Sequence, residues 1–229
     1  IRRNHLFFCL LMFFPYKDDN PRVLFPFVTY GIIVANVVIF LGQFYVTGRD
    51  PQFGAELVYS FGFVPNEFNP FKIFTSMFMH GGFGHIIGNM WFLHIFGDNI
   101  ESILGHVKYF WFYLACGLGA ALAQFLIEPA STTPMVGASG AIAGVLGAYM
   151  IRFPKAKVHI FAIIIIFITT FVVPAQIVLG LWFLMQLSGG LGSLGVDTTG
   201  GVAWFAHIGG FVVGVTSLKF FQSFHSERI

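Results

Sequence analysis

The segment "GASGAIAGVLGAYM" (residues 137–150) consists mostly of glycine, alanine and aliphatic residues, with one serine, Ser139, close to its start. This composition is typical of a membrane helix, but its 14 residues would extend only about 21 Å at 1.5 Å per residue. The hydrocarbon core of a bilayer is about 30 Å thick. The helix must therefore begin below the membrane surface, where its first N–H groups need protein or water partners. We expect Ser139 at this submerged N-terminus, beside a water-filled cavity.

The composition of the whole chain excludes a soluble domain. Of its 229 residues, 56% are hydrophobic and 10% are charged, whereas soluble domains contain about 25% charged residues. The basic residues are scattered and form no patch with interleaved aromatics, so we expect a lipid bilayer and no nucleic acid as partner.

Cys9 and Cys116 suggest no disulfide or zinc framework. Residues 1–11 show no small-residue cleavage site, so we expect no signal peptide, and Met12 would make a natural start.

The hydropathy pattern predicts an all-α, polytopic membrane protein with six transmembrane helices in one domain. The fifth span is too long for one straight helix, so we expect its front part to be a buried turn, with the helix proper starting near Ile168. Residues 47–84 are rich in aromatics, Gly and Pro, and we expect them in the membrane interface. The predicted spans are 25–46, 85–104, 108–127, 137–150, 158–187 and 202–221.

The distribution of positive charge predicts the orientation of these spans. Ten Lys and Arg residues lie in segments on the side of the N-terminus, and only Arg49 and Lys72 lie on the other side. Cytoplasmic loops carry an excess of Lys and Arg. We therefore expect a multi-pass protein of the cell membrane, with an N-terminal cytoplasmic tail (1–24), a transmembrane domain (25–221) and a C-terminal cytoplasmic tail (222–229).

Three further polar side chains interrupt the apolar spans at the depth of Ser139. His85 and Asn89 open the second span, four residues apart and so on one helical face, and His207 lies in the outer half of the sixth. The second, fourth and sixth spans all run from outside to inside, which places these groups in the outer half of the membrane. Polar and ionisable residues inside a bilayer are costly and by default mark a functional site.

Serine together with histidine indicates nucleophilic catalysis. A serine hydroxyl is a weak nucleophile until a base removes its proton, and His207 is the candidate base because spans four and six offer no Asp, Glu or Lys at that depth. The side chains of His85 and Asn89 and the backbone N–H of Ser139 could form an oxyanion hole, which the positive end of the helix would strengthen. We expect Ser139 and His207 to be catalytic.

Each of these features also has a structural explanation. Gly140, Gly144 and Gly147 could serve close helix packing, as could Gly210 and Gly214 near the face of His207. A packing role for the glycines and a catalytic role for Ser139 are compatible, because Gly140, Gly144 and Gly147 lie about 100° from Ser139 around the helix. His80 and His85 could bind a metal, but they diverge on a helix and no third ligand is obvious, so we expect neither metal nor cofactor.

The ordered set of motifs resembles the rhomboid intramembrane serine proteases over most of the chain, from about Pro15 to Phe220. The similar motifs are "HGGFGHIIGN", "GASG" and "AHIGGFVVG", together with "PYKDDNPR" before the first span and "PAQIVLGLWFLMQ" as the fifth helix. Glu101 in "FGDNIESILG" is similar to a structural glutamate of the family. Many members have Trp-Arg in the first loop where this chain has Phe71-Lys72.

The resemblance implies a Ser–His dyad without a third carboxylate, which makes Asp197 a loop residue. It also implies cleavage of transmembrane protein substrates near the outer face, with substrate entering beside the fifth helix and residues 188–201 acting as a cap. Two other classes remain open at this point. Inactive rhomboid relatives and derlins lack the dyad residues, which this chain has. A channel or transporter would need a polar path across the whole bilayer, and the inner halves of spans four and six are apolar.

Overall fold

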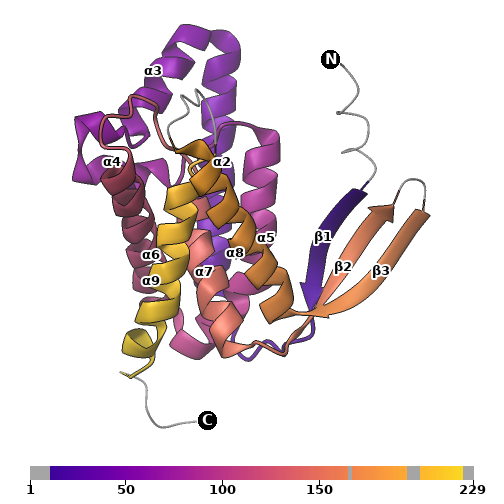
Figure 1. The fold of residues 1–229 in the computed structure, drawn as a ribbon. Helices are drawn as coiled ribbons and strands as arrows, with labels where there is room; N and C mark the ends of the chain where they lie inside the picture. Colours follow the sequence, from indigo (N-terminus) through magenta and orange to yellow (C-terminus); the bar gives the residue numbers. More distant parts are fainter. Residues whose placement is uncertain (1–10, 165–166, 195–201, 224–229) are drawn as a thin grey trace.

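The computed structural model describes residues 11–164, 167–194 and 202–223, and it is mostly helical (Figure 1). The long helices stand side by side as a bundle, with α3 and α4 at its upper end in Figure 1 and a small sheet beside it. The helices are α2 (Phe27–Arg49), α3 (Pro51–Phe61), α4 (Pro70–Ser76), α5 (Phe83–Leu104), α6 (His106–Ile127), α7 (Ser139–Arg152), α8 (Ala175–Ser193) and α9 (Trp204–Ser223), with a 3₁₀ turn at Pro65–Glu67. The strands are β1 (Leu11–Asp18), β2 (Lys157–Ile164) and β3 (Phe167–Pro174).

The chain is a helical membrane protein. Within the described ranges, α2, α6, α8 and α9 are long and apolar enough to cross a bilayer. The other two predicted spans also contain helices, α5 of 22 residues and α7 of 14 residues. Each predicted span thus contains one helix of the bundle, while the number of helices that cross the membrane stays a prediction.

The short helix α7 forms the centre of the bundle. Every residue from Gly140 to Tyr149 is buried, and the helix packs chiefly against α9 and α6 and also contacts α5 and α8. A helix surrounded in this way can be shorter than the bilayer, because its neighbours and not lipid surround its ends.

Glycines bring α7 and α9 into backbone contact. A Cβ atom at Gly210 would overlap the carbonyl oxygen of Gly140, and one at Gly214 would overlap the carbonyl oxygen of Gly144. Small residues of this kind allow membrane helices to approach closely, which strengthens dispersion contacts between them. This contact fixes the position of the N-terminus of α7 relative to that of α9.

Replacing Gly210 with alanine should lower the free energy of unfolding by about 1–3 kcal/mol, because the two backbones would have to separate. The matched control is Gly180→Ala on α8, where a Cβ would meet nothing within 4 Å. The control should be neutral or slightly stabilising, since alanine favours the helix. Thermal unfolding of the detergent-solubilised protein measures both, and equal melting of the two variants would contradict the packing role of Gly210.

The front of the predicted fifth span is a β-hairpin, so the expected helix start near Ile168 is wrong. β2 and β3 pair antiparallel, β1 pairs with β2, and α8 begins only at Ala175. The physical reason lies in the side chains: 11 of the 18 residues at positions 157–174 are Val, Ile or Thr. Such β-branched residues favour strands, and hydropathy alone does not separate a buried strand from a helix.

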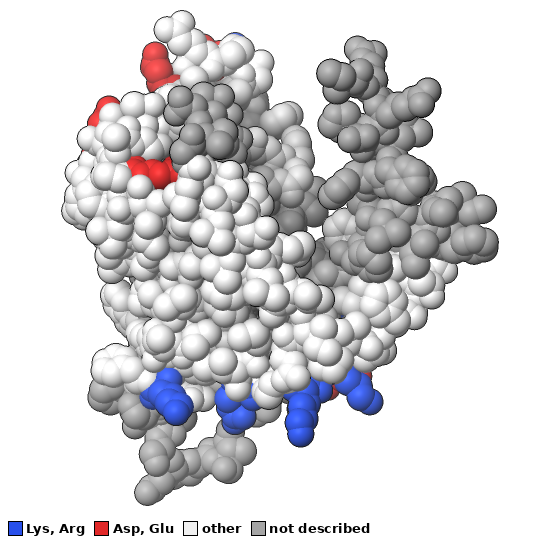
Figure 2. Space-filling view, in the orientation of Figure 1, with Lys and Arg blue, Asp and Glu red and all other residues white. Residues whose placement is uncertain are grey.

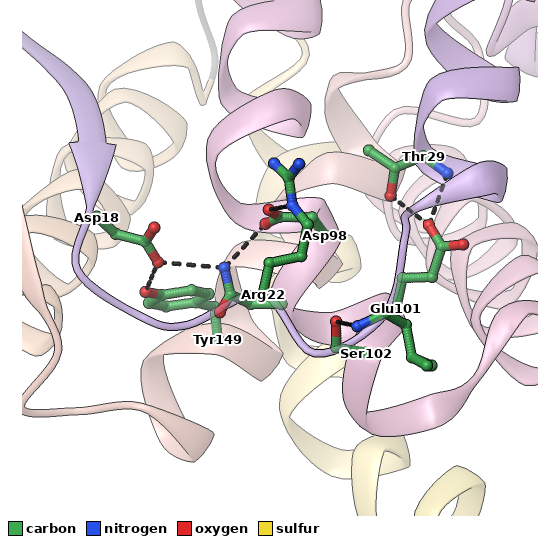
Figure 3. Close-up of polar contacts among 9 residues, drawn as sticks. Asp18, Arg22, Thr29, Asp98, Glu101, Ser102 and Tyr149 are labelled. Carbon is green, nitrogen blue, oxygen red and sulfur yellow. Dashed lines mark hydrogen bonds and ion pairs between the residues drawn. The ribbon is translucent and has the colours of Figure 1, made fainter.

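A polar cluster attaches the sheet and the lead-in to α2 to the bundle (Figure 3). The Asp18 carboxylate accepts a short hydrogen bond from the Tyr149 hydroxyl and one of 3.2 Å from Asn99 Nδ2, and Arg22 Nε lies 3.0 Å from Asp98 Oδ2. Burial raises the pKa of Asp18 to about 6, although the bond from Tyr149 opposes the shift. The segment "PYKDDNPR" thus connects β1 to α5 and α7.

The segment between α2 and α5 folds onto itself at one end of the bundle. Thr75 Oγ1 donates to the Phe61 carbonyl at 2.7 Å, and Lys72 Nζ donates to the Tyr59 carbonyl at 2.9 Å. Phe71 is 68% exposed. Lys72 therefore links α4 to α3, while Phe71 points outward, as an interfacial aromatic does.

Candidate active site

A cavity of about 710 Å³ opens among α5, α6, α7, α8, α9 and residues 133–137. The four polar side chains that we singled out in the outer half of the predicted membrane all line it: His85, Asn89, Ser139 and His207. Ile73 and Ser76 of α4 also line it, so the cavity lies toward the end of the bundle that carries α3 and α4.

Ser139 and His207 are within hydrogen-bonding distance. Ser139 is the first residue of α7, and His207 lies in the first turn of α9. The distance between Ser139 Oγ and His207 Nε2 is 2.8 Å. The glycine contacts between α7 and α9 hold both helix starts at this separation. A hydroxyl and an imidazole so placed can exchange a proton.

A strained turn precedes Ser139. Gly137 has φ +119°, which is a conformation that favours glycine, and its N–H donates to the Ser76 carbonyl at 2.9 Å. A Cβ at Gly137 would lie 2.6 Å from His85 Nε2. Both the backbone and the available space therefore require glycine, and its absence of a side chain lets His85 approach the backbone before Ser139.

The hydrogen bonds of His85 assign its proton. The Gly81 N–H donates to His85 Nδ1 at 3.3 Å, so Nδ1 is an acceptor and the neutral ring carries its proton on Nε2. Asn89 lies one turn later, 8% exposed, and its Nδ2 is without a hydrogen-bond partner among the described residues. His85 and Asn89 thus place N–H donors beside Gly137, and an unpaired buried donor such as Asn89 Nδ2 is available to a bound oxygen.

The structure places Glu101 away from this cavity. Its side chain is fully buried near the other end of α5, where its carboxylate accepts hydrogen bonds from the N–H groups of Val28 and Thr29 at 2.9 and 2.8 Å. The Thr29 hydroxyl (2.7 Å) and His106 Nδ1 (2.6 Å) complete its partners, and Figure 3 shows the contact with Thr29. Glu101 caps the N-terminus of α2, where Pro26 supplies no side-chain cap.

Sequence reasoning missed two residues beside His207. Gln186 Oε1 lies 2.7 Å from His207 Nδ1, and the Trp182 ring lies 5.9 Å from the His207 ring, centroid to centroid. A signal was present, because a glutamine inside the apolar α8 is an intramembrane polar residue of the kind that marks sites.

His80 is fully buried beside His85, and the described residues contain no group of three potential metal ligands.

Two predictions concern the segment between α8 and α9. Residues 188–193 of the expected cap are the last turns of α8. Residues 195–201, including Asp197, lie outside the described residues, so the cap and the loop position of Asp197 stay predictions.

Residues 67–223, which contain this cavity and most of the bundle, match the Rhomboid domain. The chain belongs to the rhomboid family. It is similar to RHOMBOID-like protein 6, mitochondrial, of Arabidopsis thaliana, with 30% identity over 156 residues that cover 54% of this chain and 50% of the relative. Rhomboid protein 1, mitochondrial, of Saccharomyces cerevisiae is 32% identical over 149 residues, which are 63% of this chain and 40% of the relative.

A bacterial relative carries the name of an enzyme. Rhomboid protease GluP of Bacillus subtilis is 29% identical over 129 residues, covering 55% of this chain and 24% of the relative. The chain thus spans half the length or less of these rhomboid relatives.

Proposed function

We propose that this chain is an intramembrane serine endopeptidase, which cleaves transmembrane segments of membrane proteins near the outer face through a Ser139–His207 dyad. The observation that carries the proposal is the 2.8 Å contact between Ser139 Oγ and His207 Nε2. This contact lies in a cavity that also presents N–H donors, so nucleophile, base and oxyanion donors meet at one point. The rhomboid domain and the relative named a protease support the same activity.

In the proposed reaction, His207 Nε2 takes the hydroxyl proton as Ser139 Oγ attacks a peptide carbonyl of the substrate. The negative charge on the carbonyl oxygen is stabilised by the Ser139 N–H, His85 Nε2–H and Asn89 Nδ2–H. The protonated His207 then gives its proton to the leaving amine, which leaves an acyl-enzyme on Ser139. Water hydrolyses this ester, and a cavity of about 710 Å³ has room for water, at about 30 Å³ per molecule.

The proposed setting is the cell membrane, with residues 1–24 and 222–229 both on the cytoplasmic side. Figure 2 shows most of the visible Lys and Arg at the lower end of this face, while most of the visible Asp and Glu lie near the upper end. α7 ends at Arg152, with Lys155 and Lys157 directly after it. The positive-inside rule puts this end in the cytoplasm, which turns the cavity toward the outer leaflet. The proposed partners are transmembrane protein substrates and the surrounding lipid, without nucleic acid.

A serine-acylating fluorophosphonate probe tests the dyad on the purified full chain in detergent. We expect the wild type to be labelled at Ser139, and the His207→Ala variant to be labelled at least about 100-fold more slowly, because the hydroxyl has lost its base. The matched control is His94→Ala, because His94 stacks on Tyr30 and does not line the cavity. The control should react like the wild type. Equal labelling of His207→Ala and wild type, or no labelling of the wild type, would overturn the proposed mechanism.

A further inference from the structure

The second nitrogen of His207 has a partner on α8. Gln186 is only 6% exposed, and its Oε1 lies 2.7 Å from His207 Nδ1. Its Nε2 donates to the Trp182 carbonyl one turn earlier, at 3.4 Å. Both ends of the Gln186 amide are therefore engaged, one with the imidazole and the other with the backbone of its own helix.

These two contacts determine which nitrogen of His207 carries the proton. A backbone carbonyl only accepts, so the NH₂ end of the amide must face the Trp182 carbonyl and the oxygen end must face His207. An amide oxygen is also only an acceptor, so His207 Nδ1 must be the donor. In the neutral ring the proton then sits on Nδ1, and Nε2 is free to accept from Ser139. The opposite amide orientation would set two carbonyl oxygens against each other, 3.4 Å apart, and is disfavoured.

We propose that Gln186 is a positioning residue for the catalytic base, holding His207 in the tautomer that can take the Ser139 proton. This inference rests on the proposed function. Without an acceptor at Nδ1 the ring could carry its proton on Nε2, where it would donate to Ser139 and could not act as the base. Trp182, from the same helix, lies against the ring, so α8 supplies both contacts that orient the base.

The Gln186 side chain is uncharged, which fits its buried position on the apolar helix α8. A carboxylate in this place would bring a buried charge into an apolar helix, which is costly inside a membrane. The groups facing His207 are Ser139 from α7, Gln186 and Trp182 from α8 and, across the cavity, the titratable His85 from α5. An amide accepts the Nδ1–H bond without adding charge to this set, and so orients the base while leaving it neutral before reaction.

The first test is the Gln186→Leu variant, which keeps the side-chain volume and removes the acceptor. With a tagged single-span substrate in liposomes, kcat should fall about 10- to 100-fold, since a buried Nδ1–H is left unpaired or the ring changes tautomer. KM should stay near the wild-type value, because substrate contacts are unchanged. The matched control Gln176→Leu makes the same replacement at an exposed position of the same helix, and its kcat should not change.

A second variant, Gln186→Glu, separates positioning from packing. A carboxylate also accepts from Nδ1–H but stabilises the protonated imidazole, so the pH at half-maximal kcat should rise by about 1–3 pH units. Above that pH, kcat should recover beyond that of Gln186→Leu. Rates are expressed per labelled Ser139, which removes differences in folded fraction, and if Gln186→Leu does not fold, the pH profile of Gln186→Glu decides.

Two results would overturn the positioning role while leaving the proposed protease intact. One is a wild-type kcat for Gln186→Leu, and the other is an equal loss in both variants with an unchanged pH profile, which would indicate packing alone. A wild type that neither cleaves nor reacts with the probe would overturn the dyad itself, and the positioning role with it.

Discussion

Replacing Ser139 with alanine should reduce cleavage of a tagged single-span substrate to background, a loss of at least about 1,000-fold, because no other group in the proposed mechanism can form the acyl-enzyme. The remaining oxyanion donors would still bind a carbonyl but would have no nucleophile beside them. The fold should be nearly unaffected, since the change removes one partly buried hydroxyl from a site next to a cavity. Gel analysis of the cleavage products and thermal unfolding in detergent measure the two effects.

The matched control for this loss is Ser217→Ala on α9. The Ser217 hydroxyl donates to the Val213 carbonyl of its own helix at 2.6 Å and does not line the cavity. Its removal should leave cleavage at the wild-type rate. If Ser139→Ala cleaved as fast as this control, the chain would not be a serine protease, whatever the geometry of the cavity. If both variants lost activity together with their melting transitions, the loss would report unfolding and not chemistry.

Much of the candidate site follows from the sequence through two physical constraints. A helix of 14 residues is shorter than a bilayer, so we expected Ser139 to be submerged and surrounded by protein. Polar groups in lipid need partners, so His85, Asn89 and His207 at one depth were expected to meet Ser139. The structure brings all four to one cavity. The meeting of the four residues could be predicted because polarity is a property of each segment alone, while their depth in the membrane stays a prediction.

The remaining features depend on how segments are rotated and paired, which hydropathy does not report. The sequence predicts a buried turn where β2 lies and a helix from about Ile168, where β3 lies, because a buried strand and a buried helix are equally apolar. Gln186 was passed over, because its contact with His207 Nδ1 depends on the rotation of α8 about its axis. The bond between Asp18 and Tyr149 joins residues 131 positions apart, and no local pattern indicates it.

Replacing Glu101 with alanine should lower the free energy of unfolding by about 3–5 kcal/mol, the cost of breaking a buried, charge-assisted network. Its carboxylate is the acceptor for the first free N–H groups of α2, those of Val28 and Thr29. Removal leaves these donors without a partner and takes a negative charge from the positive end of the helix. Pro26, at the N-cap position, cannot compensate, because its side chain makes no capping hydrogen bond.

The effect should appear in stability and not in the chemical step, because Glu101 caps α2 and does not line the cavity. Reversible unfolding in mixed micelles measures the first, and kcat per labelled Ser139 measures the second, which should stay near the wild-type value. Glu67→Ala is the matched control: that side chain is 67% exposed and lies 3.9 Å from Lys72, so its removal should change stability by less than about 1 kcal/mol. Unchanged unfolding of Glu101→Ala together with lost cleavage would show that Glu101 serves the reaction instead, and that the cap on α2 contributes little to the fold.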